Sequence, residues 1–315
     1  MKIVFMGTPE FATGILEAIV LSNKHEIAAV VTAADKPAGR GMKLTKSSVK
    51  QFAEKHQLRL LQPEKLRDED FIKTLQSIQA DIFVVVAFRM LPELVWSIPP
   101  KGTINLHASL LPQYRGAAPI NWAIINGETT TGVSTFFINE KIDEGNLIIS
   151  KEVPIEEEDN AGSLHDKLLE IGEITVLETL EQIETNTYKE TKQAHSDTLK
   201  YAPKLFKEDG KINWNQSANQ IHNLIRGLSP YPVAYTVFVA KNKRKETMKI
   251  YKSQAVVEKH HATVGLVETD NKSYVRIPCS DGYIYIDEIQ LVGKKRMPIK
   301  DFLLGNKNMH LVQCL

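Results

Sequence analysis

Cysteine is scarce in this chain of 315 residues, since it occurs only at Cys279 and Cys314. Two such distant residues provide neither a disulfide framework nor the closely spaced pair that zinc sites use, and this fits a reducing cytoplasm. The longest apolar run, IFVVVAF at 82–88, is far shorter than the ~20 residues of a membrane helix. The initial KIVFMG is too short for a signal peptide. We therefore expect a cytoplasmic protein with no bound metal and no membrane contact.

Several enzyme signatures are also missing. After the first apolar run the chain reads GTPEFATG at 7–14, which lacks the G-x-G-x-x-G spacing of dinucleotide-binding folds. Neither a Walker loop nor a G-x-S-x-G elbow occurs in the sequence. These absences argue against a nicotinamide-dependent dehydrogenase, a P-loop NTPase and an α/β-hydrolase.

Short apolar runs alternate with helical patterns in the first part of the chain. KIVFM (2–6), EIAAVVT (26–32), LRLLQ (58–62) and DIFVVVAF (81–88) read as strands, and amphipathic segments lie between them. Apolar strands that alternate with helices are typical of a parallel sheet covered on both faces. We expect an α/β domain with a doubly wound, mostly parallel, Rossmann-like sheet, to which GTINLH (102–107) adds a further strand.

The pattern changes toward the C-terminus. TGVSTFFINEKIDEGNLIISKEVPI (131–155) reads as two strands joined by a turn at 143–145, and a long helix is expected at roughly 161–185. One helix and about five short alternating strands then favour a small β-barrel of the oligonucleotide-binding (OB) type.

These patterns divide the chain into two domains and a connection. We expect a first domain over residues 1–188, a linker over 189–205, where the sequence is polar and aperiodic, and a C-terminal β-barrel over 206–315. The length agrees with this division, because 315 residues are too many for one core.

Charge is distributed unevenly along the chain, although the formal net charge is only +1. Residues 1–200 contain 21 Lys/Arg and 28 Asp/Glu, whereas residues 201–315 contain 18 and 10, so the two parts carry net charges of −7 and +8. A basic C-terminal part indicates a polyanionic partner. Its densest clusters are KNKRK at 241–245 and KKR at 294–296. Taken alone, either cluster is better explained as a solvated lysine-rich surface.

The stretch INLHASLLPQYRGAAP (104–119) carries an amide and an imidazole at the end of a predicted strand. Because side chains alternate along a strand, Asn105 and His107 share one face. Asn105 can donate to a developing oxyanion and His107 can move a proton. Asp143 in the later turn can orient and stabilise the imidazole, so acyl or formyl transfer to nitrogen is feasible. A strand-end histidine and a turn-forming aspartate also have common structural explanations.

A longer string, NLHASLLPQYRGAAPINWAIINGETTTGVSTFFINEKIDEGNLI (105–148), resembles the signature region of the folate-dependent formyltransferases. FMGTPEFA near the N-terminus, KPAGRGMKLTKSSVK at 36–50 and FVVVAFRMLP at 83–92 also match that family. In the C-terminal part, KINW and IRGLSPYPVAYT do the same. The resemblance therefore covers nearly the whole chain.

The resemblance implies a reaction and a catalytic set. The implied reaction is transfer of the formyl group of 10-formyltetrahydrofolate to the α-amino group of methionine esterified to initiator tRNA. Asn105 is implied as the oxyanion donor, His107 as the group that transfers the proton, and Asp143 as the residue that holds and stabilises His107.

The resemblance also implies residues that contact the two substrates. Those expected at the folate site are Ser109, Leu110, Leu111, Pro112 and Phe88. Those expected to contact tRNA are Arg40 and Lys43 in a basic loop at 35–46, and Lys241, Lys243, Arg244 and Lys245 in the C-terminal domain. The chain departs from the family at Phe88–Arg89, where relatives often have a Tyr-Gly pair.

Two other functions remain open from the sequence. A formyltransferase that acts on a sugar nucleotide would share the amide, the imidazole and the carboxylate, but it needs no basic loop and no basic second domain. A non-catalytic module that binds RNA or folate could use the same fold. The charge of residues 201–315 favours tRNA. We expect a monomer, since no exposed apolar helix is evident.

Overall fold

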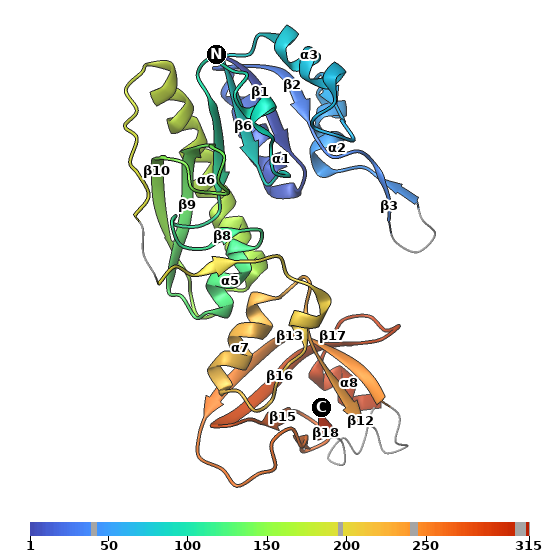
Figure 1. The fold of residues 1–315 in the computed structure, drawn as a ribbon. Helices are drawn as coiled ribbons and strands as arrows, with labels where there is room; N and C mark the ends of the chain where they lie inside the picture. The colour runs from blue at the N-terminus through green and yellow to red at the C-terminus, as the bar shows by residue number, and fades with distance from the viewer. Residues whose placement is uncertain (39–42, 195–197, 240–244, 306–312, 315) are drawn as a thin grey trace. The chain divides into compact units, whose positions relative to one another are not determined.

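The computed structural model describes residues 1–38, 43–194, 198–239, 245–305 and 313–314 (Figure 1). Contacts within the chain divide it into two units. Unit 1 contains Met1–Gly116, Thr131–Val153 and His165–Tyr201, and unit 2 contains Ala117–Thr130, Pro154–Leu164 and Ala202–Leu315. Each unit is therefore built from stretches that are distant in the sequence.

A seven-stranded sheet forms the centre of unit 1. In spatial order its strands are β10 (Leu147–Pro154), β9 (Thr130–Phe137), β7 (Thr103–His107), β6 (Ile82–Val86), β1 (Lys2–Gly7), β2 (Glu26–Val31) and β5 (Leu60–Leu61). The pairs from β5 to β7 are parallel, and β9 runs antiparallel to β7. The predicted doubly wound, mostly parallel sheet is confirmed.

The strand order reverses between β1 and β6. From β1 the chain proceeds to β2 and β5 on one side, and it returns to β6 and β7 on the other. In open α/β sheets, ligands bind beyond the carboxyl ends of the strands near such a reversal. The end of β7 lies in this region of the sheet.

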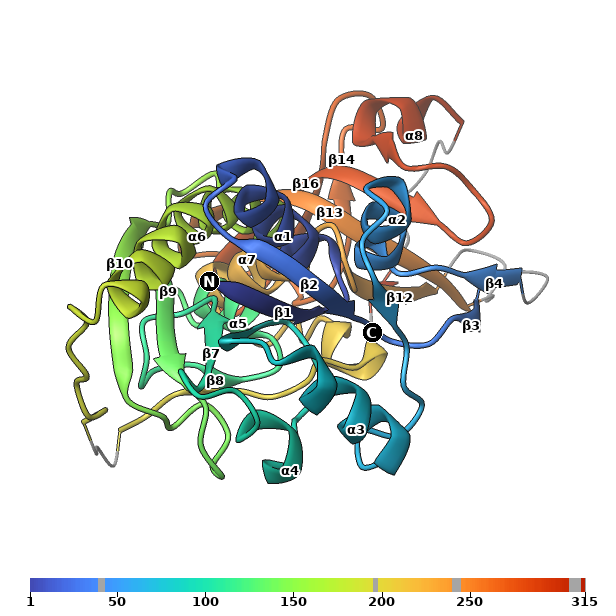
Figure 2. The same cartoon turned by 90° about the horizontal axis from the view of Figure 1, so that it is seen from above.

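Helices cover both faces of the sheet (Figure 2). One face carries α1 (Glu10–Ser22), α2 (Ser48–Lys55) and α6 (Ala161–Glu184), and the other carries α3 (Glu69–Ile78) and α4 (Glu93–Trp96). Val4 and Val85 belong to the same buried cluster as Leu75 of α3. On the opposite face, a Cβ added to Gly172 of α6 would lie 3.1 Å from Cδ2 of Leu106. Leu106 therefore faces α6.

Side-chain caps determine where several helices begin. Ser47 accepts a hydrogen bond from the Lys50 amide at the start of α2. Asp68 accepts from the Phe71 amide, so α3 begins at Glu69. Such caps satisfy amide groups that have no partner within the helix, and each contributes about 0.5–2 kcal/mol.

Two short strand pairs lie outside the large sheets. β3 (Lys36–Ala38) pairs with β4 (Lys43–Thr45), and β8 (Arg115–Gly116) pairs with β11 (Tyr201–Ala202). The first pair forms part of the predicted basic loop. The second joins the segment after β7 to the segment that follows α6.

An antiparallel sheet forms the centre of unit 2, in agreement with the predicted C-terminal β-barrel. Its spatial order is β14 (Glu268–Thr269), β15 (Val275–Pro278), β16 (Gly282–Leu291), β13 (Lys245–Val257), β12 (Ala234–Val239) and β18 (Gln313–Cys314), and β17 (Met297–Pro298) pairs with β16. The helices are α5 (Pro119–Ile125), η1 (Lys207–Gly210), α7 (Ala218–Gly227) and α8 (Ile299–Gly305). The sequence predicted α7 but not α8, which is only 7 residues long.

The core of unit 2 lies between this sheet and its helices. Trp214, Ile221 and Ile225 are buried with Phe238 and Ile250 of the sheet. α5 packs against α7, and Asn121 donates a hydrogen bond to the Gly227 carbonyl at 2.8 Å. Among the described helices of both units, none has the length and apolar character that a membrane-spanning helix requires.

Candidate active site

Asn105 and His107 lie at the carboxyl end of β7, between two hydrogen-bonded neighbours. Asn105 is opposite Val85 of β6, and His107 is opposite Ser134 of β9. Because Leu106 faces α6, the amide and the imidazole project from the other face of the sheet. The structure thus places both side chains on one face, as the alternation along a strand requires.

His107 is buried, with 7% of its surface exposed, and its two nitrogens have different surroundings. Nε2 donates a hydrogen bond to the Tyr114 carbonyl at 2.8 Å. Because a carbonyl oxygen only accepts, Nε2 carries the proton of the neutral ring, and Nδ1 is free to accept one. Nδ1 lies 3.9 Å from Oδ2 of Asp143. The carboxylate is therefore placed to stabilise a charged imidazolium.

Asn105 has unused hydrogen-bonding capacity. Its side chain is half-buried, and its Oδ1 is buried with no hydrogen-bond partner among the described residues. Buried polar atoms are nearly always paired in folded proteins. An amide with an orphaned buried atom at a strand end, beside a histidine, is the feature expected where a ligand completes the hydrogen bonds.

The turn after β9 brings Asp143 to His107. Asp143 adopts a φ of 54°, in the left-handed region that few residues with a Cβ occupy. Its Oδ2 accepts a hydrogen bond from the Gly116 amide at 2.9 Å. Two residues later, a Cβ added to Gly145 would lie 1.6 Å from the Phe137 carbonyl oxygen. The turn therefore packs directly against the end of β9.

The loop that follows β7 is held by a hydroxyl group of β9. Ser134, which is fully buried, donates to the Ser109 carbonyl at 2.8 Å and accepts from the Leu111 amide at 3.1 Å. Ser109 in turn donates to the Gln113 carbonyl at 2.7 Å. Residues 109–112, which were predicted for the folate site, thus continue directly from the end of β7.

Phe88, the other residue predicted for the folate site, follows β6. It is half-buried against the cluster between the sheet and α3. The Arg89 guanidinium lies 5.5 Å from the centre of the Phe88 ring, and Nη1 of Arg89 donates to the Glu64 carbonyl at 2.9 Å. The side chains of the unusual Phe88–Arg89 pair thus contact each other and the segment after β5.

Two family models match this chain. Residues 1–180 match the model described as formyl transferase, and residues 204–307 match the formyl transferase C-terminal domain. The chain belongs to the formyltransferase family. The membership predicted from the sequence motifs is thereby confirmed.

The alignments with similar proteins extend over almost the whole of this formyltransferase chain. The methionyl-tRNA formyltransferase of Flavobacterium johnsoniae is 50% identical over 97% of this chain and 96% of its own length. The protein of that name from Bacteroides thetaiotaomicron is 48% identical over 97% and 95%. Among solved structures, the sugar 3N-formyl transferase WlaRD aligns with a TM-score of 0.65 over 94% of this chain and 99% of its own. At 24% identity, that last likeness shows the fold alone.

Most of the basic residues predicted to contact tRNA lie outside the described residues. These are Arg40, Lys241, Lys243 and Arg244. Lys43 begins β4, and Lys245 begins β13 with an exposed side chain. In the KKR cluster, Arg296 pairs with Glu288 and lies 4.3 Å from the centre of the Tyr251 ring, whereas Lys294 and Lys295 are exposed.

The basic loop of this formyltransferase is anchored at its start by Asp35. The Asp35 carboxylate accepts hydrogen bonds from Lys50 at 2.7 Å and from Gln62 at 3.0 Å. The hydrogen bond from Lys50, and then that from Gln62, lowers the pKa of the Asp35 carboxyl group. The carboxylate therefore stays charged and joins the start of the loop to α2 and to the segment after β5.

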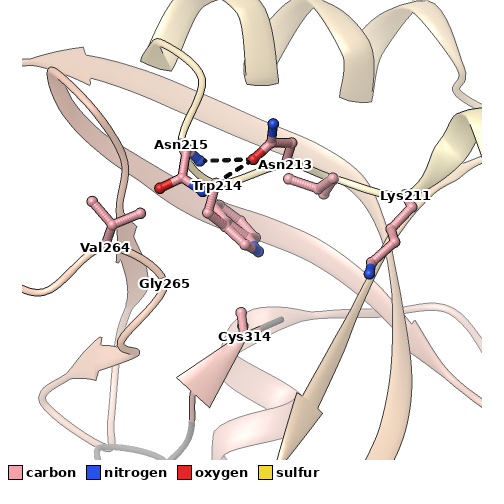
Figure 3. Close-up of a pocket in the computed structure, with 8 residues that line it drawn as sticks. Lys211, Asn213, Trp214, Asn215, Val264, Gly265 and Cys314 are labelled. Carbon is pink, nitrogen blue, oxygen red and sulfur yellow. Dashed lines mark hydrogen bonds between the residues drawn. The ribbon is translucent and has the colours of Figure 1, made fainter.

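A cavity of about 360 Å³ lies in unit 2 (Figure 3). Its lining consists of Lys211, Ile212, Asn213, Trp214, Asn215, Val264, Gly265 and Cys314. Trp214 donates to Thr236 at 3.0 Å, and Asn213 accepts from the Asn215 amide at 3.1 Å, so these groups are already paired. The predicted catalytic residues belong to unit 1 instead. Within the described part of the chain, no three His, Cys, Asp or Glu side chains are grouped to hold a metal ion.

The close packing of the Asp143 turn leads to a testable prediction. Gly145→Ala forces a methyl group into the Phe137 carbonyl, so we expect the free energy of unfolding to fall by about 1–3 kcal/mol or more. Gly305→Ala is the matched control, because a Cβ there meets nothing within 4 Å. Urea unfolding of both variants measures the difference. Equal stability of the two variants would contradict the packing described for the turn.

Proposed function

We propose that this chain transfers the formyl group of 10-formyltetrahydrofolate to the α-amino group of methionyl initiator tRNA. The observation that carries the proposal is the 50% identity to a methionyl-tRNA formyltransferase over 97% of this chain, which includes both matched family regions. The grouping of Asn105, His107 and Asp143 at one sheet edge supports it, because amine formylation requires these chemical functions.

Each catalytic residue has a distinct role in this proposal. 10-Formyltetrahydrofolate supplies the formyl group as co-substrate and leaves as tetrahydrofolate. The side-chain amide of Asn105 donates to the formyl oxygen as negative charge develops there. His107 accepts the proton of the attacking amine at Nδ1 and passes it toward N10 of the leaving folate. Asp143, 3.9 Å away, stabilises the imidazolium while the proton resides there.

The two substrates are assigned to different parts of the chain. Residues 1–188 form the catalytic domain, in which the loop 109–112 and Phe88 border the folate. Residues 206–315 contribute the basic surface for tRNA, together with the loop at 35–46. The support for this division is the excess of Lys and Arg after residue 200.

A direct assay tests the reaction. The purified chain is given 10-formyltetrahydrofolate together with methionyl initiator tRNA, free methionine or a dTDP-amino sugar. We expect formylation of the tRNA-bound methionine and none above background for the other two acceptors. Formylation of the amino sugar alone would assign the chain to the sugar-nucleotide reaction instead.

Replacement of Asn105 tests the oxyanion role. Asn105→Ala should lower kcat by about 10²–10³, the usual cost of one oxyanion donor. The fold should persist, because the Asn105 Oδ1 makes no hydrogen bond that would be lost. Asn219→Ala, at an exposed position of α7, is the matched control. Wild-type turnover in folded Asn105→Ala protein would contradict the role.

Salt dependence tests the assignment of the basic surface. Each phosphate contact contributes about −0.9 to the slope of log affinity against log salt, so tRNA affinity should fall steeply between ~50 and ~200 mM salt. Folate affinity should hardly change over the same range. Both are measured by fluorescence titration. Equal slopes for the two ligands would reject the assignment.

A further inference from the structure

A single distant side chain holds the turn that carries Asp143. Nε2 of Gln193 donates one hydrogen bond to the Asp143 carbonyl at 2.8 Å and another to the Gly145 carbonyl at 2.9 Å. A side-chain amide has two N–H groups, so both are used here. The backbone on both sides of Glu144 is therefore connected to one rigid planar group.

Gln193 is itself held in one orientation by Arg115. Nε and Nη2 of Arg115 donate to Oε1 of Gln193 at 3.1 and 2.6 Å, and Nη1 lies 3.0 Å from Oε1 of Glu144. Arg115 is 6% exposed. Because a guanidinium group only donates, the Gln193 oxygen must face Arg115, and the amide nitrogen must face the turn.

Backbone pairing brings Gln193 to this position. Thr191 and Leu147 exchange two backbone hydrogen bonds at 2.8 and 2.9 Å, which aligns the segment after α6 with the start of β10. Within residues 191–194, only the Gln193 side chain is half-buried, and its neighbours are exposed. The segment therefore directs one polar side chain inward, against the turn.

The turn needs such support because its conformation is uncommon and its position is critical. Asp143 has a φ of 54°, which is unfavourable for a residue with a Cβ unless the surroundings enforce it. Its carboxylate must stay near His107 to act on the imidazolium, and the attraction weakens with distance. The Gly116 amide and the Gln193 side chain bond directly to Asp143. The ion pair between Arg115 and Glu144 and the packing of Gly145 add support to the same turn.

We propose that Gln193 is a positioning residue for formyl transfer, which keeps the Asp143 carboxylate beside the imidazole of His107. This role rests on the proposed function and extends it to a residue outside the predicted domain of residues 1–188. Gln193 contacts neither substrate in this proposal. It acts through the turn alone.

The substitution Gln193→Glu separates the two contacts of this side chain. A glutamate still accepts from Arg115, and with a charge-assisted hydrogen bond. It replaces the NH₂ group by an oxygen that faces the carbonyls of Asp143 and Gly145 and repels them. We expect kcat to fall about 10- to 100-fold, since small displacements of catalytic groups have effects of this size. The KM for both substrates should stay close to that of the wild type, and a cooperative thermal unfolding transition shows that the variant is folded.

Asn146→Ala is the matched control. Asn146 donates to Glu190 at 2.8 Å, so it joins the same two segments, but through an exposed contact that does not reach Asp143. Its kcat should equal that of the wild type. Amide hydrogen exchange across residues 139–146 should be faster in Gln193→Glu and unchanged in Asn146→Ala.

The outcomes distinguish the inference from the function on which it rests. Wild-type kcat in folded Gln193→Glu protein, or a raised KM with unchanged kcat, would overturn the positioning role. If kcat falls by the same factor in Gln193→Glu and in Asn146→Ala, the positioning role of Gln193 is also overturned. If the unaltered chain does not formylate methionyl-tRNA, the proposed function is wrong, and the hydrogen exchange still decides whether Gln193 holds the turn.

Discussion

The pairing of β7 with β6 on one side and β9 on the other is the constraint on which the site depends. The parallel pairing with β6 places the end of β7 near the reversal of strand order, which is the region where open α/β sheets bind their ligands. The antiparallel pairing with β9 brings the turn after that strand back toward the same edge. A shift of one residue in either register would turn Asn105 and His107 to the opposite face. The hydrogen bonds of one strand thus determine the position of all three polar side chains.

Backbone groups and one buried hydroxyl group hold the polar side chains and the loop of this site in place. The Tyr114 carbonyl selects the tautomer of His107, the Gly116 amide holds the Asp143 carboxylate, and the buried hydroxyl of Ser134 fixes the loop after β7. These partners have fixed positions because they belong to paired strands or to loops docked on them. A site built this way needs little rearrangement when charge develops during a reaction, and that is the main source of electrostatic stabilisation in enzymes.

Arg115 and Gln193 add a further layer behind the polar residues. Burial of a polar side chain costs free energy unless it forms hydrogen bonds. Arg115 and Gln193 avoid this cost because Arg115 donates two hydrogen bonds to the Gln193 oxygen. The same layer joins three segments of unit 1: the loop after β7, the turn after β9 and the residues after α6. Their mutual support explains how a strained aspartate can be maintained at the edge of the sheet.

The sequence by itself determined the family, the fold of each part and the shared face of Asn105 and His107. It could do so because apolar periodicity and strand alternation are local properties, and because the signature string from 105 to 148 is long and specific. Only the tertiary structure decided which groups hold these side chains. Gln193 lies in a polar stretch for which the sequence pattern predicts only a linker. The Tyr114 group that contacts His107 is a backbone carbonyl, which every residue has, so the sequence does not distinguish it. Likewise α5 follows β7 and its loop in sequence but packs in unit 2. Such contacts join residues far apart in the chain or involve the backbone, and neither kind leaves a periodic trace in the sequence.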